Sequence, residues 1–239
     1  MLKTKNDHPW WSGAAGRRQR LGRKRWLRLA LLGIVAGVGC YLLAALAVQV
    51  WAPAWLFRGT IVLDPGHGGA GSPGCVYAGI VERDVALELS LLLRDELAQR
   101  GYRVIMTRDT DQAVSLEERA ALANKGGADL FISIHLNAHD VASVNGIETW
   151  FNPHTNSESS ALAEHVQRSL VAATGAKDRG TYPSTSLYLT REVRLPACLV
   201  EAGYLSNEAE REKLNSEAYR QQVARGIADG VDAYLAEPR

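Results

Sequence analysis

A long uncharged apolar run near the N-terminus constrains this chain more than any other feature. Leu29–Val50 covers 22 residues without one Asp, Glu, Lys or Arg, and Gln49 is its only strongly polar side chain. As a helix the run would be about 33 Å long, enough to cross a hydrocarbon core of about 30 Å. Trp26 and Trp51 flank it, as in the aromatic belts at membrane interfaces. The sequence therefore predicts one N-terminal transmembrane helix over residues 29–51.

The charges around this run predict its orientation. Residues 1–28 hold nine Lys/Arg and one acid, so they carry +8, and residues 29–239 carry −7 of the net +1. Because positive residues stay on the cytoplasmic side, the tail should lie inside and the chain from Thr60 outside. A basic tail can also be a nucleic-acid-binding arm, but the adjoining apolar run argues against a nucleic-acid partner. We expect the tail to set topology and to contact anionic membrane lipid.

A cleaved export signal is the alternative to a retained anchor. The apolar run is longer than the 7–15 residues of a typical signal core. Ala52-Pro53-Ala54 resembles a small-residue cleavage site, but proline fits such a site poorly, and Arg17-Arg18 lacks the surroundings of a twin-arginine signal. The expected organisation is a cytoplasmic tail over 1–28, a membrane anchor over 29–51, a linker over 52–59 and an external globular domain over 60–239.

The three cysteines do not form a disulfide framework. Cys40 falls inside the predicted membrane helix, Cys75 in a Gly-rich loop and Cys198 in an apolar run that predicts a buried strand. A bond between the last two stays open at this point, although small buried side chains are the favoured interpretation.

Beyond the linker, predicted strands and helices alternate. Short apolar runs predict strands at 60–64, 102–107, 129–134, 146–151, 186–190 and 197–201. Periodicity and end signals predict helices at 82–100, 115–124, 157–173, 208–214 and 217–235. Ser115 and Glu118 form the signature of a capping box. Strands separated by helices are typical of an α/β domain with a mainly parallel sheet.

Four polar side chains are expected at one edge of that sheet. His67 follows the first strand in Asp64-Pro65-Gly66-His67-Gly68-Gly69, His135 ends the third, and Glu201 ends the last. Glu82 stands at the start of the first long helix. Ligands and reacting groups gather at the carboxyl ends of strands in α/β sheets. Taken singly, each residue also has an ordinary interpretation, such as a hydrogen-bonded histidine or a first-turn acid favoured by the helix dipole.

Taken together, these residues predict a definite chemistry. Two imidazoles and one carboxylate are a ligand set for catalytic zinc, with the fourth position left for water. Burial of Glu201 after an apolar run would raise its pKa, as a general base near neutral pH requires. The ligand spacings of 15 and 53 residues do not belong to a short helical motif such as H-E-x-x-H.

From about Ile61 to Leu235, the chain resembles the zinc-dependent N-acetylmuramoyl-L-alanine amidases of the amidase-3 type. The motifs that carry the resemblance are IVLDPGHGG at 61–69, VERDVALELS at 81–90, FISIHLNA at 131–138 and LVEAGYLSN at 199–207. The resemblance implies that His67, Glu82 and His135 hold one Zn²⁺ ion. It also implies that Glu201 is the catalytic carboxylate. Asn137 in the third motif and Arg179 in KDRG are the expected substrate-binding residues.

The resemblance also implies a fold, a substrate and a partner. The fold is a six-stranded sheet flanked by helices, and the substrate is peptidoglycan. The bond cleaved is the amide between N-acetylmuramic acid and L-alanine of the stem peptide. A short domain behind an N-terminal anchor is similar to the spore-cortex and germination subgroup. A catalytically silent wall- or partner-binding module and a zinc peptidase acting elsewhere on the stem peptide are the alternatives, and the need for a protein activator stays open.

Overall fold

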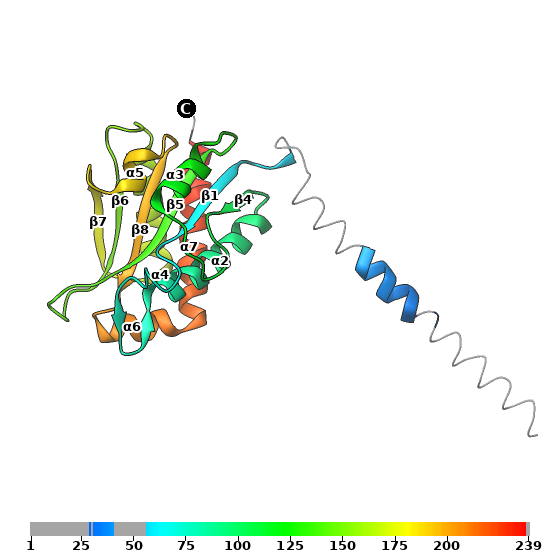
Figure 1. The fold of residues 1–239 in the computed structure, drawn as a ribbon, viewed down its shortest axis with the longest axis horizontal. Helices are drawn as coiled ribbons and strands as arrows, with labels where there is room; N and C mark the ends of the chain where they lie inside the picture. The colour runs from blue at the N-terminus through cyan, green and yellow to red at the C-terminus, as the bar shows by residue number, and fades with distance from the viewer. Residues whose placement is uncertain (1–28, 30, 41–55, 238–239) are drawn as a thin grey trace, which may run out of the picture. The chain divides into compact units, whose positions relative to one another are not determined.

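The computed structural model describes residues 29, 31–40 and 56–237 (Figure 1). The chain separates into two units, Met1–Ala52 and Pro53–Arg239. Leu29 and residues 31–40 are helical. Within the described ranges, no helix combines the length and the apolar character needed to cross a membrane. The predicted tail, most of the predicted membrane span and the start of the linker lie outside the described residues.

A six-stranded sheet forms the centre of the second unit, in the order β4-β1-β5-β8-β6-β7. Its strands are β1 (Thr60–Pro65), β4 (Arg103–Met106), β5 (Leu130–Asn137), β6 (Ile147–Phe151), β7 (Asp178–Pro183) and β8 (Ala197–Tyr204). The pair β6–β8 is antiparallel, and the other neighbours run parallel. The expected mainly parallel six-stranded sheet is therefore confirmed.

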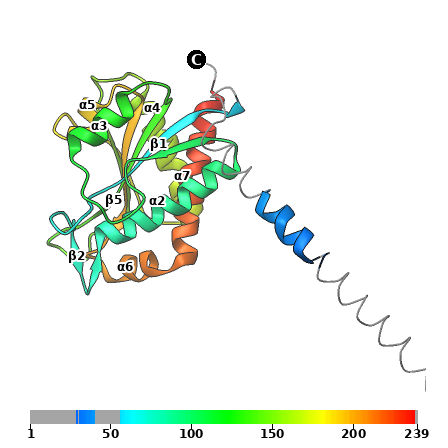
Figure 2. The same ribbon diagram turned by 45° about the vertical axis from the view of Figure 1, so that its right-hand side comes forward.

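Helices lie on both sides of this sheet (Figures 1 and 2). They are α2 (Glu82–Gln99), α3 (Leu116–Asn124), α4 (Ser159–Thr174), α5 (Tyr188–Glu192), α6 (Glu208–Asn215) and α7 (Glu217–Ala236). A small hairpin of β2 (Val76–Tyr77) and β3 (Ile80–Val81) precedes α2. The expected capping box is present, since the Ser115 side chain accepts from the Glu118 amide and the Glu118 side chain accepts from the Ser115 amide.

Alternation along the strands gives the sheet two different faces. Ile61, Ile132 and Val200 point into the main core, which also contains apolar side chains of α2, α4 and α7; we call this the core face. Val62 and Phe131 point the other way and pack with α3 and α5, which cover one part of that face. His135 and Glu201 also lie on this second face, because their chain neighbours Ile134 and Val200 point into the main core. We therefore call it the site face.

One predicted strand is wrong. The residues predicted as a strand at 186–190 largely enter the short helix α5, and the sixth strand is instead β7. Periodicity cannot separate helix from strand in a run of five residues. The β7 strand escaped prediction because it is an edge strand with exposed ends, and Pro183 closes it where no ladder donor is needed.

One further expectation is corrected in detail, and the open question of a Cys75–Cys198 bond is settled. The strands β5 and β8 continue to Asn137 and Tyr204, so His135 and Glu201 lie inside strands. Cys75 and Cys198 are both free, which leaves the interpretation as small reduced side chains. Burial raises the pKa of the Cys198 thiol to about 12.

Candidate metal centre

The three predicted ligands meet on the site face. His67 lies in the loop after β1, Glu82 opens α2, and His135 lies on β5; one ligand atom from each lies within 4.8 Å of the others. Glu82 Oε1 is 3.0 Å from His67 Nε2 and 2.9 Å from His135 Nδ1. The two imidazole rings meet edge to face, with centroids 4.9 Å apart and planes at 75°. All three side chains therefore aim at one small volume.

The loop after β1 turns sharply to place His67. Its backbone adopts a φ of 62°, which is uncommon for a residue other than glycine, and its Nδ1 lies 3.1 Å from Ser72 Oγ. Gly66 passes close to the second ligand, because a Cβ at this position would lie 2.4 Å from Cε1 of His135. Only glycine lets the loop approach the imidazole so closely, which explains its place in the motif.

The buried ion pair of Asp64 and Arg119 holds the loop that carries His67. Asp64 is fully buried and accepts hydrogen bonds of 2.6 Å from each of Thr107 Oγ1, Ser133 Oγ and Arg119 Nη1. Arg119 also donates to the backbone carbonyls of Pro65 and His67. The pair thus fixes the main chain on either side of Gly66.

A second buried arginine joins the loop to α2. Arg108 Nη2 donates to the carbonyls of Gly66, at 2.7 Å, and Arg83, at 2.8 Å. Arg83 follows Glu82 in the chain, so Arg108 ties together the segments that bear two of the three donors. Sequence reasoning did not single out Arg108 or Arg119.

The carboxylate of Glu82 is held by backbone amides as well as by the histidines. Its Oε2 accepts from the Cys75 amide at 2.8 Å, and its Oε1 accepts from the Leu136 amide at 3.1 Å. Burial alone would raise the pKa of Glu82, but hydrogen bonds from His135 and His67 hold it well below its ordinary range. An ionised carboxylate and two imidazoles fit the donor set of a catalytic zinc site, and the backbone contacts orient the carboxylate.

Glu201 lies beside His135 in the register of β5 and β8. Its Oε2 is buried and has no hydrogen-bond partner among the described residues. Burial raises the pKa of Glu201 to about 7, with a further increase from the charges of Glu82 and Glu148 and an opposing effect of His135. A carboxyl group with such a pKa is suited to accept and return a proton near neutral pH.

The two predicted substrate-binding residues meet at Glu148, which sequence reasoning did not single out. Asn137 Nδ2 donates to Glu148 Oε1 at 2.7 Å, and Arg179 Nε donates to Glu148 Oε2 at 2.8 Å. The side-chain oxygen Oδ1 of Asn137 also accepts from the Ala138 amide at 2.8 Å. Glu148 is the register partner of Glu201, so both residues are hydrogen-bonded to the neighbour of Glu201, and their contact with substrate stays a prediction.

Comparison with known proteins assigns the family. Residues 61–233 match the model of Amidase_3, described as N-acetylmuramoyl-L-alanine amidase. The chain is similar to the germination-specific N-acetylmuramoyl-L-alanine amidase of Bacillus subtilis, with 34% identity, 74% of this chain covered and 80% of the relative. It is 32% identical to the B. subtilis amidase LytC over 92% of this chain, and it spans 43% of LytC.

A solved structure supports the same assignment. The N-acetylmuramoyl-L-alanine amidase from Clostridium difficile 630 superposes with a TM-score of 0.72 and 36% sequence identity. The match covers 76% of this chain and 98% of the amidase. Fold and sequence agree, and the chain belongs to the Amidase_3 family of N-acetylmuramoyl-L-alanine amidases.

Proposed function

We propose that this protein hydrolyses the amide bond between N-acetylmuramic acid and L-alanine in peptidoglycan, with one zinc ion held by His67, Glu82 and His135. A single observation carries the proposal. The three donor atoms meet on the site face, where the neighbouring carboxyl group of Glu201 has a buried oxygen that no described residue contacts by a hydrogen bond. Family membership and the names of the relatives support the choice of bond.

The residues divide the work of hydrolysis between them. Zinc held by His67, Glu82 and His135 would supply a Lewis acid that polarises the scissile carbonyl and makes water easier to deprotonate. Glu201 takes the proton of the attacking water at its free oxygen and delivers it to the nitrogen that leaves. The water oxygen bonds to the carbonyl carbon, the C–N bond breaks, and the products are a muramic carboxyl group and the free amine of L-alanine. The Cys75 and Leu136 amides keep Glu82 in place throughout.

Mass spectrometry of digested muropeptides tests this function. Wild-type protein should release stem peptides with a free amine on L-alanine, and a chelator should stop the release until zinc is added back. Cleavage between later residues of the stem peptide would identify a peptidase and contradict the proposal. Intact muropeptides after digestion at saturating zinc would identify a silent binding module, which also contradicts it.

We also propose that residues 29–51 anchor the enzyme in the membrane, with the tail in the cytoplasm and the catalytic domain outside. The uncharged run Leu29–Val50 and the basic residues before it support this topology. A periplasmic-type reporter fused after Arg239 should be active outside the cytoplasm. Cytoplasmic fluorescence of a fused fluorescent protein, without external accessibility to protease, would contradict the orientation. N-terminal sequencing of the membrane-extracted protein distinguishes a retained anchor from a cleaved signal.

A further inference from the structure

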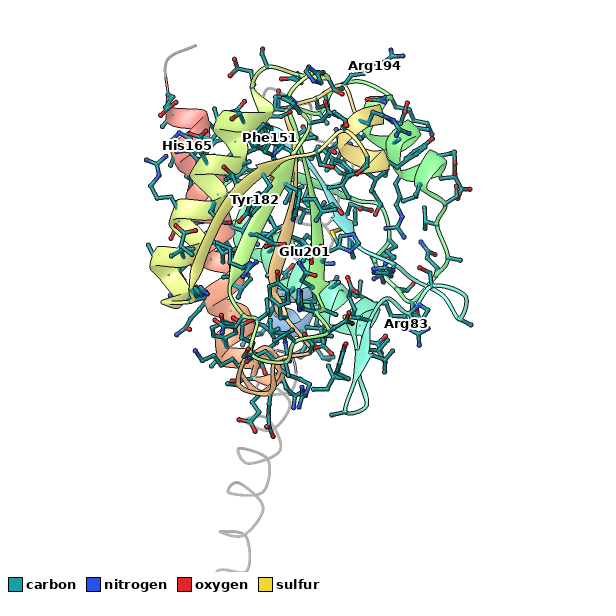
Figure 3. All side chains as sticks on the ribbon, turned by 90° about the vertical axis from the view of Figure 1, so that its left-hand side faces the viewer. Arg83, Phe151, His165, Tyr182, Arg194 and Glu201 are labelled. Atoms are coloured by element: carbon teal, nitrogen blue, oxygen red, sulfur yellow. The ribbon has the colours of Figure 1, made fainter. Side chains whose placement is uncertain are left out.

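The site face does not end at Glu201 but continues over β6 and β7. Glu148 on β6 pairs with Glu201 on β8, and Trp150 follows on the same face two residues along β6. Tyr182 on β7 lies opposite Trp150 in the register. The intervening Thr149 points to the core face, where its hydroxyl donates to Gln167 of α4 at 2.8 Å. Figure 3 looks at this end of the sheet and labels Tyr182 and Glu201.

Two aromatic rings form the surface of this extension. The rings of Trp150 and Tyr182 have centroids 5.0 Å apart and planes inclined by 31°, and Tyr182 is 36% exposed. Hydrogen bonds hold both residues, since Trp150 Nε1 donates to Glu148 at 3.3 Å and the Tyr182 hydroxyl donates to the Arg179 carbonyl at 2.7 Å. The rings are therefore fixed before any ligand arrives, which reduces the entropy lost on binding.

Charged groups border the aromatic pair on the side toward Glu201. Glu148 is buried, and Arg179 lies against it with a side chain that is 27% exposed. Arg179 also lies over the Tyr204 ring, with its guanidinium carbon 5.2 Å from the ring centroid. Its Nε donates to Glu148 and its Nη1 to the Asn145 carbonyl at 3.5 Å, and a guanidinium group has further N–H donors beyond these two.

We propose that Glu148, Trp150, Arg179 and Tyr182 form a sugar-binding subsite, which holds the glycan part of the substrate while Glu201 acts on the adjacent amide. This inference rests on the proposed function. The flat C–H face of a pyranose ring packs on an aromatic ring, while hydroxyl and acetamido groups require planar donors and acceptors at its edge. The subsite offers both, and Trp150 lies about 7 Å along β6 from the residue paired with Glu201.

The backbone around the subsite favours a sugar over a peptide. The main-chain groups of β6 are already paired with β7 on one side and β8 on the other. A peptide lying over Trp150 would therefore find side chains but no unpaired main-chain groups of β6. A sugar ring does not need main-chain hydrogen bonds from the strand, because side chains alone can bind it.

A separate pocket is available for the stem peptide. It has a volume of about 320 Å³ and lies on the other side of the metal ligands, toward β1 and β5. Its lining includes His67 and His135 together with the apolar side chains of Val114, Leu116 and Leu189. Because Glu201 lies on β8, between the pocket and the aromatic pair, the two halves of the substrate would leave the scissile amide in opposite directions.

Binding of peptide-free glycan strands to the full-length protein in detergent tests the proposal. Peptide-free glycan lacks the scissile amide, so calorimetry reports affinity alone. We expect Trp150→Ala and Tyr182→Ala each to weaken glycan binding by about tenfold, as loss of an aromatic contact predicts. Trp150→Phe keeps the ring and should retain binding. Leu116→Ala removes a 46% exposed side chain on the opposite pocket and should also retain it.

Fluorescence adds a direct readout of contact. Trp150 is the only tryptophan after residue 55, and its emission should change when glycan binds; this change should vanish in Trp150→Phe. Unchanged glycan affinity in folded Trp150→Ala and Tyr182→Ala would overturn the proposal. So would a loss of affinity for free stem peptide in these variants with glycan affinity intact. Glycan binding that depends on Trp150 in a protein that cleaves no muropeptide would support the subsite while contradicting the proposed function.

Discussion

Glu148 on β6 and Glu201 on β8 are paired in the register of the sheet, but their carboxylates differ in hydrogen bonding. One oxygen of Glu201 is buried without a partner among the described residues. The Glu148 carboxylate accepts hydrogen bonds from Asn137, Trp150, Arg179 and Tyr204. A saturated carboxylate is fixed in place, whereas one with a free oxygen can take up a proton. Different surroundings for two neighbouring acids are a common basis for dividing roles in a catalytic site.

Replacement of the free carboxyl group should abolish turnover and leave the metal in place. Glu201→Gln keeps the shape of the side chain but cannot accept the proton of water. We expect muropeptide hydrolysis to fall by about 10²- to 10⁴-fold, the usual contribution of general acid–base catalysis, with zinc content unchanged by mass spectrometry. Glu192→Gln, at a 45% exposed side chain, is the matched control. Full activity of Glu201→Gln at saturating zinc would show that the proton-transfer role is wrong.

Loss of a ligand should reduce zinc content and activity together. His67→Ala and His135→Ala each remove one of the three donors that meet near Glu82 Oε1. We expect purified variants to contain less than one zinc per chain and to regain little activity when zinc is added. His154→Ala, at an exposed histidine outside this cluster, should keep both properties. Wild-type zinc affinity in His67→Ala would remove this residue from the ligand set.

A single methyl group beside the metal centre should have a large effect. In Gly66→Ala, the added Cβ would meet the His135 ring at 2.4 Å, so the imidazole or the loop must move. We expect zinc affinity to fall by about 10- to 100-fold, as with other changes that reorient a metal ligand. Gly71→Ala is the matched control, because nothing lies within 4 Å of a Cβ there. Competition with a fluorescent chelator measures both, and equal affinities would contradict the close packing.

The ion pair beneath the loop should matter for stability. Asp64 and Arg119 are 2.6 Å apart with side chains 0% and 4% exposed, so Arg119→Met leaves an uncompensated buried carboxylate. We expect the free energy of unfolding to fall by about 3–5 kcal/mol, measured by urea denaturation. Arg94→Met breaks an exposed pair with Asp95 and should cost less than about 1 kcal/mol. Similar losses in both variants would contradict this role of the buried pair.

The general architecture and the meeting of the three donor side chains could be predicted because they follow from local patterns. Buried parallel strands are continuous apolar runs, and the Ser115 capping box marks a helix start without help from distant residues. The Gly-rich loop around His67 and the apolar strand before His135 have similarly clear signals. Because β1 and β5 run parallel, the residues at their carboxyl ends lie at the same edge of the sheet. There the structure brings His67 and His135 together with Glu82.

The remaining features depend on distant contacts that a sequence does not display. β7 is stabilised by pairing with β6 at the edge of the sheet, and its own residues have no buried-strand pattern. Charged residues such as Asp64, Arg108 and Glu148 are expected at the surface when only the sequence is known. In the structure they are buried, and each has a hydrogen-bond partner tens of residues away in the chain. Their burial is possible only because those partners arrive with the fold.

The alternation along β8 has a consequence for how this enzyme can evolve. Val200 and Glu201 are neighbours in the chain, but the Val200 side chain points to the core face and the Glu201 side chain to the site face. Deleting one residue just before them would turn the acid into the hydrophobic interior and a valine toward the substrate, so a single indel would remove stability and activity at once. We therefore expect changes in length among related sequences to fall in surface loops such as 138–146 and not within this strand.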